Sequence, residues 1–209
     1  GFGRVEGLFP RAYAGGVARG GRLRYFLSGE YDYERIRVPG VTFGRGSPDT
    51  KEVSGTLFGR FDAQLSEHHT VTAEGIFFPG QKTFHRLSPL RPTTAAPTVS
   101  DTDVFVGLVD RHVLSPTSLL TLRLGVLAHD TTVSPVSTLA PALTPLGWTG
   151  ASFSTFDRRS SRVAASAAWQ RSVATSTGTH TVTAEASFAY ERLNGVVSNR
   201  AVSILDASG

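Results

Sequence analysis

Ionisable side chains recur at every second position along several stretches of this chain, a spacing that places them on one face of a β-strand. Glu30, Asp32 and Glu34 follow one another in this way, and Arg60 and Asp62 repeat the spacing further along. The full set predicted to share such a face is Glu30, Asp32, Glu34, Arg60, Asp62, Glu74, Arg123, Arg162, Glu185 and Glu191. Because acids and bases are mixed, neighbouring strands can pair them, and this predicts structural ion pairs along a wall.

Other residues capable of chemistry lack the spacing that a site needs. Glu67, His68 and His69 are potential metal ligands, but adjacent residues on a turn diverge, so we predict a solvated turn and no metal. The other histidines have no partners at ligand spacing. The chain has no Cys, which excludes thiolate metal sites and disulfides. No Gly-x-Ser-x-Gly elbow and no dinucleotide-binding loop occurs, so we expect no catalytic residues, no cofactor and no enzymatic activity.

Apolar residues occupy the parity that the charged residues leave vacant. In residues 23–33 the odd positions Leu23, Tyr25 and Leu27 oppose even, mostly polar positions, and the same contrast recurs in later blocks. No stretch approaches the roughly 18 consecutive apolar residues of a membrane helix. Charged residues are 18% of the chain, below the roughly 25% of a soluble domain. The pattern predicts strands with one greasy and one ionic face.

Short turns and long loops alternate between these blocks. The predicted strands are residues 1–9, 13–18, 23–38, 53–65, 70–78, 101–114, 119–130, 161–173 and 180–192, and residues 193–209 form a loop leading towards another strand. Tight turns are expected at 19–22, 66–69, 115–118 and 175–178, and long loops at 39–52, 79–100 and 131–160. Outer-membrane barrels have short periplasmic turns and long external loops. The sequence therefore predicts an all-β fold, an antiparallel up-and-down transmembrane β-barrel, with residues 1–209 as a partial wall of about nine or ten strands.

The net charge of +4 and the pI near 9.8 raise the question of a nucleic-acid partner. The arginines are scattered, and no Lys/Arg-rich run exists, so we expect no nucleic-acid binding. The first residues have no charged segment followed by an apolar core, so we expect no signal peptide within them. The barrel interpretation instead names the lipid of a Gram-negative outer membrane as the partner of the greasy face.

Three stretches resemble the barrel of TonB-dependent outer-membrane receptors, in particular the Oar-like branch. Residues 20–31, GGRLRYFLSGEY, resemble a strand of that branch in which a basic turn leads into an aromatic run. Residues 56–62, TLFGRFD, with residues 65–69, LSEHH, resemble its next hairpin, and residues 114–117, LSPT, resemble a later turn. These motifs cover about residues 13–130, and beyond them the likeness is one of pattern alone.

The resemblance implies a 22-stranded barrel that contains its own plug domain, works with a TonB-type energy-coupling protein and imports a scarce small solute. It also implies that some of the charged residues above face the lumen, where they hold the plug or line the solute path. Aromatic loop residues, Phe84, Trp148 and Phe153, are candidates for ligand contact outside. These residues contain no plug domain and no TonB box, so we expect a fragment of a longer protein. The alternatives are a passive porin or small closed barrel, and a soluble β-sandwich binding module.

Overall fold

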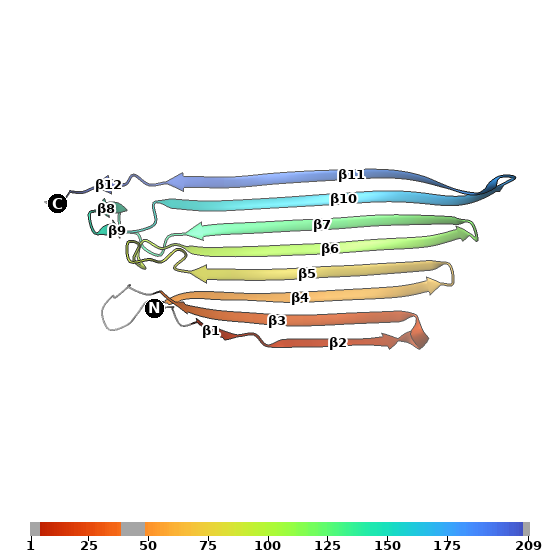
Figure 1. The fold of residues 1–209 in the computed structure, drawn as a ribbon, viewed down its shortest axis with the longest axis horizontal. Helices are drawn as coiled ribbons and strands as arrows, with labels where there is room; N and C mark the ends of the chain where they lie inside the picture. Colours follow the sequence, from red (N-terminus) through yellow and green to blue (C-terminus); the bar gives the residue numbers. More distant parts are fainter. Residues whose placement is uncertain (1–4, 39–48, 207–209) are drawn as a thin grey trace.

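The computed structural model describes residues 5–38 and 49–206, which form one long open sheet and a smaller one (Figure 1). The strands are β1 (Val5–Leu8), β2 (Arg11–Ala18), β3 (Leu23–Arg37), β4 (Asp49–Ser66), β5 (His69–Thr83), β6 (Thr98–Ser115), β7 (Ser118–Ser134), β8 (Ala142–Thr144), β9 (Gly147–Thr149), β10 (Ser154–Thr175), β11 (Gly178–Asn199) and β12 (Ser203–Ile204). The large sheet has nine strands in the order β1-β3-β4-β5-β6-β7-β10-β11, and β2 also pairs with β3. All its neighbours are antiparallel. This confirms the predicted all-β, up-and-down wall, which is open.

The strands extend beyond their predicted ends, chiefly towards the long loops. β4 begins at Asp49 rather than at residue 53, and β5 continues past residue 78 to Thr83. Backbone pairing, not hydrophobicity, decides where a strand ends, so polar residues such as Glu52 and Lys82 still form rungs. Pro79 leaves a gap, because Gly55 and Thr56 have no rung with β5 where proline offers no N–H.

The two ends of the sheet differ as the loop lengths predicted. Two-residue turns connect β4 to β5, β6 to β7 and β10 to β11 at one end, which we call the turn end. There the short 3-10 segment η1 (Arg19–Gly21) also joins β2 to β3. Its residues all have positive φ, which explains the two glycines at this turn. Of the predicted loop 39–52, residues 39–48 lie outside the described residues, and residues 49–52 belong to β4.

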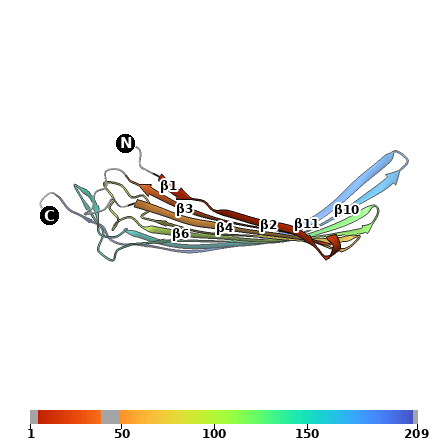
Figure 2. The same cartoon turned by 90° about the horizontal axis from the view of Figure 1, so that it is seen from below.

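The β10–β11 hairpin reaches furthest at the turn end (Figure 1). Its pairing with β7 stops at Arg171, whereas β10 and β11 remain paired to Thr175 and Gly178. Seen edge-on, the large sheet is a single layer whose β10–β11 end bends away from the plane (Figure 2). Within the described residues, no helix has the length and apolarity to cross a membrane.

Register sorts the side chains of the large sheet into an apolar face and a polar face. One rung of the apolar face joins Leu27, Gly59, Gly75, Val106, Val126, Val163 and Tyr190. One rung of the polar face joins Arg24, Asp62, Thr72, Val109, Arg123, Ser166 and Ser187. The two-sidedness predicted strand by strand therefore holds across the sheet, because successive residues of a strand alternate between its faces.

Polar residues limit the apolar face at both ends of the strands. On β7 the apolar run covers residues 120–128 and on β11 residues 182–190, each about nine residues, near the length of a transmembrane strand. Arg35 and Lys51 lie on this face beyond the run towards the loops. Towards the turns, Asp110 and His112 lie on it opposite Leu122 and Leu120, so on β6 the apolar run ends earlier than on β7. The sheet thus carries a band of apolar side chains rather than a uniformly apolar surface.

Close packing occurs in the connections opposite the turn end, which we call the loop end. Among the described residues, the buried apolar side chains are Leu87, Ala95, Ala96, Ala151 and Pro141, all outside the large sheet. β8 and β9 form a hairpin inside the predicted loop 131–160, and β12 joins β8 in parallel. The backbone N–H of Trp148 donates to the Leu90 carbonyl oxygen at 2.8 Å, and this hydrogen bond links the two long connections. We call this unit, residues 84–97 and 135–153 with β12, the loop platform.

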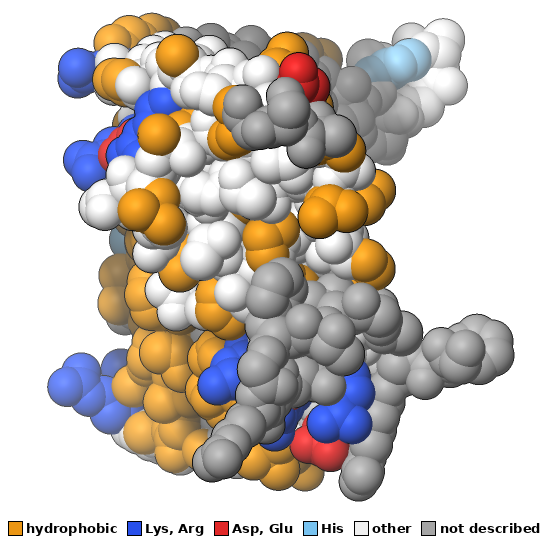
Figure 3. All heavy atoms as spheres, turned by 90° about the vertical axis from the view of Figure 1, so that its left-hand side faces the viewer, with side chains coloured by type: hydrophobic (Ala, Val, Ile, Leu, Met, Phe, Trp, Pro, Cys, Tyr) orange, Lys and Arg blue, Asp and Glu red, His pale blue; other side chains and the backbone are white. Residues whose placement is uncertain are grey.

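Viewed from the loop end, hydrophobic side chains are interspersed with Lys and Arg, and few acidic side chains are visible (Figure 3). Large hydrophobic side chains remain exposed on both faces of the sheet. Leu57, on the apolar face, is 59% exposed, and Leu127, on the polar face, is 45% exposed. The sheet therefore has no interior of its own.

Candidate functional site

The charged residues predicted to share a face do share one. The register places them on the polar face, on six different strands: Glu30, Asp32, Glu34, Arg60, Asp62, Glu74, Arg123, Arg162, Glu185 and Glu191. Their predicted orientation towards a lumen stays a prediction, because the described sheet is open. What the structure adds is their arrangement into pairs and one hollow.

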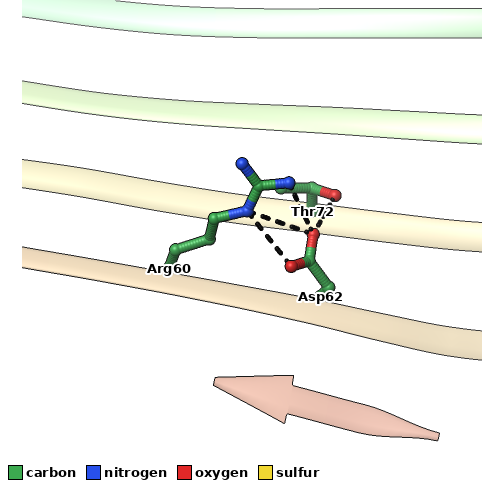
Figure 4. Close-up of polar contacts among 3 residues, drawn as sticks. All are labelled: Arg60, Asp62 and Thr72. Carbon is green, nitrogen blue, oxygen red and sulfur yellow. Dashed lines mark hydrogen bonds and ion pairs between the residues drawn. The ribbon is translucent and has the colours of Figure 1, made fainter. Parts of the chain in front are cut away.

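The best-connected group is Arg60, Asp62 and Thr72 (Figure 4). The Arg60 Nε and Nη2 donate to the Asp62 carboxylate at 3.1 Å, both residues lying on β4. From β5, the Thr72 hydroxyl donates to Asp62 Oδ1 at 2.7 Å. The carboxylate is therefore held between its own strand and the next, which fixes the orientation of Arg60.

Four further members of the set, Glu30, Asp32, Arg162 and Glu191, have partners across strands. Arg11 on β2 lies 2.5 Å from Glu30, Arg162 lies 3.4 Å from Glu191, and the Ser54 hydroxyl donates to Asp32 at 3.5 Å. These groups are mostly well exposed, and exposed ion pairs contribute only about 0–1 kcal/mol each. Among these contacts, Arg162 with Glu191 is an acid–base pair between two members of the set on neighbouring strands, and such an exposed pair contributes to orientation more than to stability.

A hollow of 480 Å³ on the polar face brings four of the predicted residues together. Its floor consists of small residues on neighbouring strands, including the rung Gly107, Gly125 and Ala164. Around it stand two acids and two bases, Glu74, Arg123, Arg162 and Glu185. The volume lies within the range of about 300–1,000 Å³ found for small-molecule sites. Small floor residues create the space, and charged residues give it polarity.

An apolar stripe crosses the polar face beside this hollow. One rung joins Phe58, Ile76, Phe105 and Leu127, and Phe26 lies 6.0 Å from Phe58 between ring centroids. Ile76 and Leu127 are 40% and 45% exposed. Ile76 and Phe78 stand on the polar parity close to residue 78, where the predicted strand 70–78 ends. That predicted end is wrong: β5 continues to Thr83, so both residues lie inside the strand, and Ile76 belongs to a continuous stripe.

The histidines are better partnered than their spacing predicted. His69 is the first residue of β5 rather than part of a solvated turn, and its Nε2 lies 2.7 Å from Asp110 Oδ1. The His69 ring also stacks on His112 of β6, with centroids 5.0 Å apart. Within residues 5–38 and 49–206, however, no group of three or more His, Cys, Asp or Glu has the geometry of a metal site. The cluster is a local ion pair and ring stack.

His129 has two partners that sequence reasoning missed. Its Nδ1 lies 2.6 Å from Asp103 Oδ1 on the neighbouring strand β6. Its Nε2 lies 2.7 Å from the hydroxyl of Thr131, which is on β7 like His129 itself. Asp103 is far from His129 in sequence, so only the β6–β7 register reveals the pair. The three side chains form one hydrogen-bonded chain on the polar face.

The aromatic loop residues proposed for ligand contact, Phe84, Trp148 and Phe153, belong to the loop platform. Trp148 stacks on Phe153 with centroids 5.6 Å apart, and the guanidinium carbon of Arg91 lies 6.0 Å from the Trp148 ring centroid. Phe84 has positive φ at the start of the platform, and its carbonyl oxygen accepts from the Thr50 hydroxyl at 3.4 Å. The Trp148 ring therefore packs between Phe153 and Arg91 and helps to hold the long connections together.

The loop platform also contains His85, whose side chain is partly buried. Its Nδ1 finds no hydrogen-bond partner among the described residues. Burial lowers the pKa of His85 from 6.5, and the nearby cations Arg86, Lys82 and Arg91 lower it further. His85 is consequently neutral at pH 7.

Comparisons with known proteins place no relative beside this chain. No protein-family model, curated protein or solved structure matches it. The interpretation of the site therefore rests on its own geometry.

Proposed function

We propose that this chain is a wall segment of an outer-membrane β-barrel that serves in energy-coupled uptake of a scarce small solute, as the resemblance to TonB-dependent receptors implies. The observation that carries the proposal is the register that gives one sheet a continuous apolar band and, on its other face, charged residues. Such a band is stable against acyl chains, and the alternation of short turns with longer connections matches barrel sidedness.

The apolar stripe on the polar face favours an occluded lumen over a water-filled pore. Phe26, Ile76 and Leu127 would each expose apolar surface to water in an open channel, at roughly 25 cal/mol per Å². A plug packed against the stripe would remove this cost, and the paired charges on either side would orient it. We therefore favour a gated receptor over a passive porin.

Apart from the short β1, the large sheet has eight strands, β2 to β7 with β10 and β11, and neighbours along it alternate in direction. This even number is the observation that favours the passive alternative, a small closed barrel. A soluble β-sandwich has less support. It requires a second sheet over the apolar face, and within the described residues the small sheet contains only β8, β9 and β12, at the loop end.

Single thiols test the membrane proposal, because the chain has no Cys of its own. We expect a membrane-impermeant maleimide to label Arg60→Cys and Arg123→Cys in vesicles permeabilised to the reagent. Leu57→Cys and Leu122→Cys on the opposite face should stay unlabelled until detergent is added. Equal labelling of all four positions before detergent would overturn the proposal.

Electrical recording separates the receptor from the porin. In planar bilayers we expect the complete protein to show no steady conductance, because the lumen is occupied. A stable open channel in every insertion event would instead support the passive barrel.

A further inference from the structure

The geometry points to a hydrolytic site on the polar face, in which Thr131 is the nucleophile, His129 its general base and Asp103 the positioning residue. The proposal goes beyond solute uptake and does not depend on it. Its substrate class is a small carboxylic ester with an anionic group near the scissile bond. Three observations carry it: the hydrogen-bonded chain, its rigid placement and an adjacent basic hollow.

The chain has the connectivity that activates a hydroxyl group. Asp103 Oδ1 lies 2.6 Å from His129 Nδ1, and Thr131 Oγ1 lies 2.7 Å from His129 Nε2. A carboxylate accepts from the Nδ1–H, and this leaves Nε2 as the acceptor for the Thr131 hydroxyl proton. Nucleophile, base and positioning carboxylate in this order are the arrangement of hydrolytic triads on unrelated folds.

Two neighbouring strands hold the three groups in place. Asp103 and His129 form one rung of the β6–β7 ladder, and Thr131 follows two residues later on the same face. All three are partly exposed, with the side chains of His129 and Asp103 35% and 44% accessible. The site lies beyond the end of the apolar band, because at the same height on the apolar face the residues are polar, with Thr102 opposite Asp130. A dissolved ester can therefore reach it from water.

A hollow of 360 Å³ lies beside the chain on the same face. Arg158 and Ser160, which line it, are the rung partners of Thr131 and His129 on β10. Leu127 and Leu193 give the hollow apolar walls. Arg162 also lines it, paired with Glu191 at 3.4 Å, so Arg158 is the lining guanidinium on which the recognition of an anion rests. Arg158 is the cation nearest in register to the nucleophile, so it is placed to stabilise the oxyanion that develops during attack.

The reaction uses water as its only co-reactant. Thr131 Oγ1 bonds to the acyl carbon while its proton passes to His129 Nε2, and the bond to the alcohol oxygen breaks as that proton transfers to the leaving group. The acyl-threonine is then attacked by water, with His129 again accepting the proton. The carboxylic acid leaves, and the Thr131 hydroxyl is restored.

The test uses the full chain in detergent micelles, with 4-nitrophenyl acetate and mono-4-nitrophenyl glutarate as neutral and anionic esters. We expect Thr131→Ala and His129→Gln each to lower kcat/KM by about 100-fold or more, the scale of a lost general base or nucleophile. Thr131→Ser should restore activity, and Asp103→Asn should lower kcat with little effect on KM. Thr132→Ala, on the opposite face, is the matched control and should retain full activity.

Intact mass identifies the covalent step. After rapid acid quench, we expect one acyl adduct at Thr131, absent in Thr131→Ala. Arg158→Gln should lose the preference for the anionic ester by about tenfold, the effect of one exposed charge contact. Hydrolysis that survives in Thr131→Ala but not in His129→Gln would overturn the proposal, because the imidazole would then act alone. Absence of hydrolysis above that of His129→Gln would overturn it as well.

Discussion

Arg60 lies directly opposite Glu74 on the β4–β5 ladder, yet its guanidinium hydrogen-bonds to Asp62, two residues along its own strand. Arg60 binds Asp62 rather than Glu74 because Thr72 also donates to Asp62 and fixes its carboxylate where Arg60 can reach it. The Glu74 carboxylate is therefore left at the edge of the 480 Å³ hollow.

Removal of the Thr72 hydroxyl should loosen this group. We expect Thr72→Val to lower the free energy of unfolding by about 1 kcal/mol, because Asp62 loses a neutral donor while side-chain volume is conserved. Urea unfolding in lipid vesicles measures the difference. Thr70→Val, at the next position on the same face, is the control, and an equal loss there would contradict the assignment.

Gly125, in the floor of the 480 Å³ hollow, has room for a Cβ atom. A Cβ at Gly125 meets only Phe105, at 3.8 Å, so Gly125→Leu should fold normally and occupy the hollow. If the polar face is a solute path, we expect cells that carry Gly125→Leu to take up the natural solute about tenfold or more slowly, because the added side chain blocks a contact in the hollow. Gly55 lies on the apolar face, and the atom nearest to a Cβ there is the Glu30 carbonyl oxygen. Gly55→Ala is therefore the control and should leave uptake unchanged. Normal uptake by Gly125→Leu would exclude the hollow from the path.

The loop platform depends on Gly150. Its φ is +75°, and a Cβ there would collide with the Ala140 carbonyl oxygen. We expect Gly150→Ala to open the platform and to expose residues 135–153, which contain Trp148 and Phe153, to chymotrypsin. Gly20→Ala is the matched control: its φ is also positive, but nothing lies nearby, so only the conformational cost of about 1–2 kcal/mol applies.

Acid should destabilise the loop platform through His85. The folded-state pKa is lowered, so the unfolded chain binds more protons than the folded one as the pH falls below 6.5. Stability from this group is complete above pH 6.5 and declines below it. We expect protease resistance of the platform to fall between pH 7 and pH 5, and His85→Gln to reduce that pH dependence. An unchanged dependence in His85→Gln would assign the effect elsewhere.

Much of the sheet follows from alternation within single strands. The parities of residues 23–33 and 119–130 place Tyr25 and Leu122 on the same apolar face that the ladder shows. Alternation gave no phase for residues 101–114, because hydrophobic residues occupy both parities there. Phe105 and Val109 lie on the polar face, and Val104 and Val106 lie on the apolar face.

Contacts between strands were harder to predict, because they depend on register. The turn after Ser115 pairs that residue with Ser118, and a simple hairpin would then place Asp103 opposite Asp130. A one-residue shift between Val113 and Ser115 moves Asp103 opposite His129 instead. Such bulges leave no clear mark in the sequence, although each one changes every cross-strand contact beyond it.

A ribbon without an interior has consequences for how the protein is made. Since apolar groups on the sheet gain shelter only from an outside medium, the proposed barrel would fold and enter its membrane in a single event. Before that event, unpaired edge backbone of its strands would be open to pairing with other chains. The proposal therefore implies an escort through water and a machine that adds strands to an existing wall.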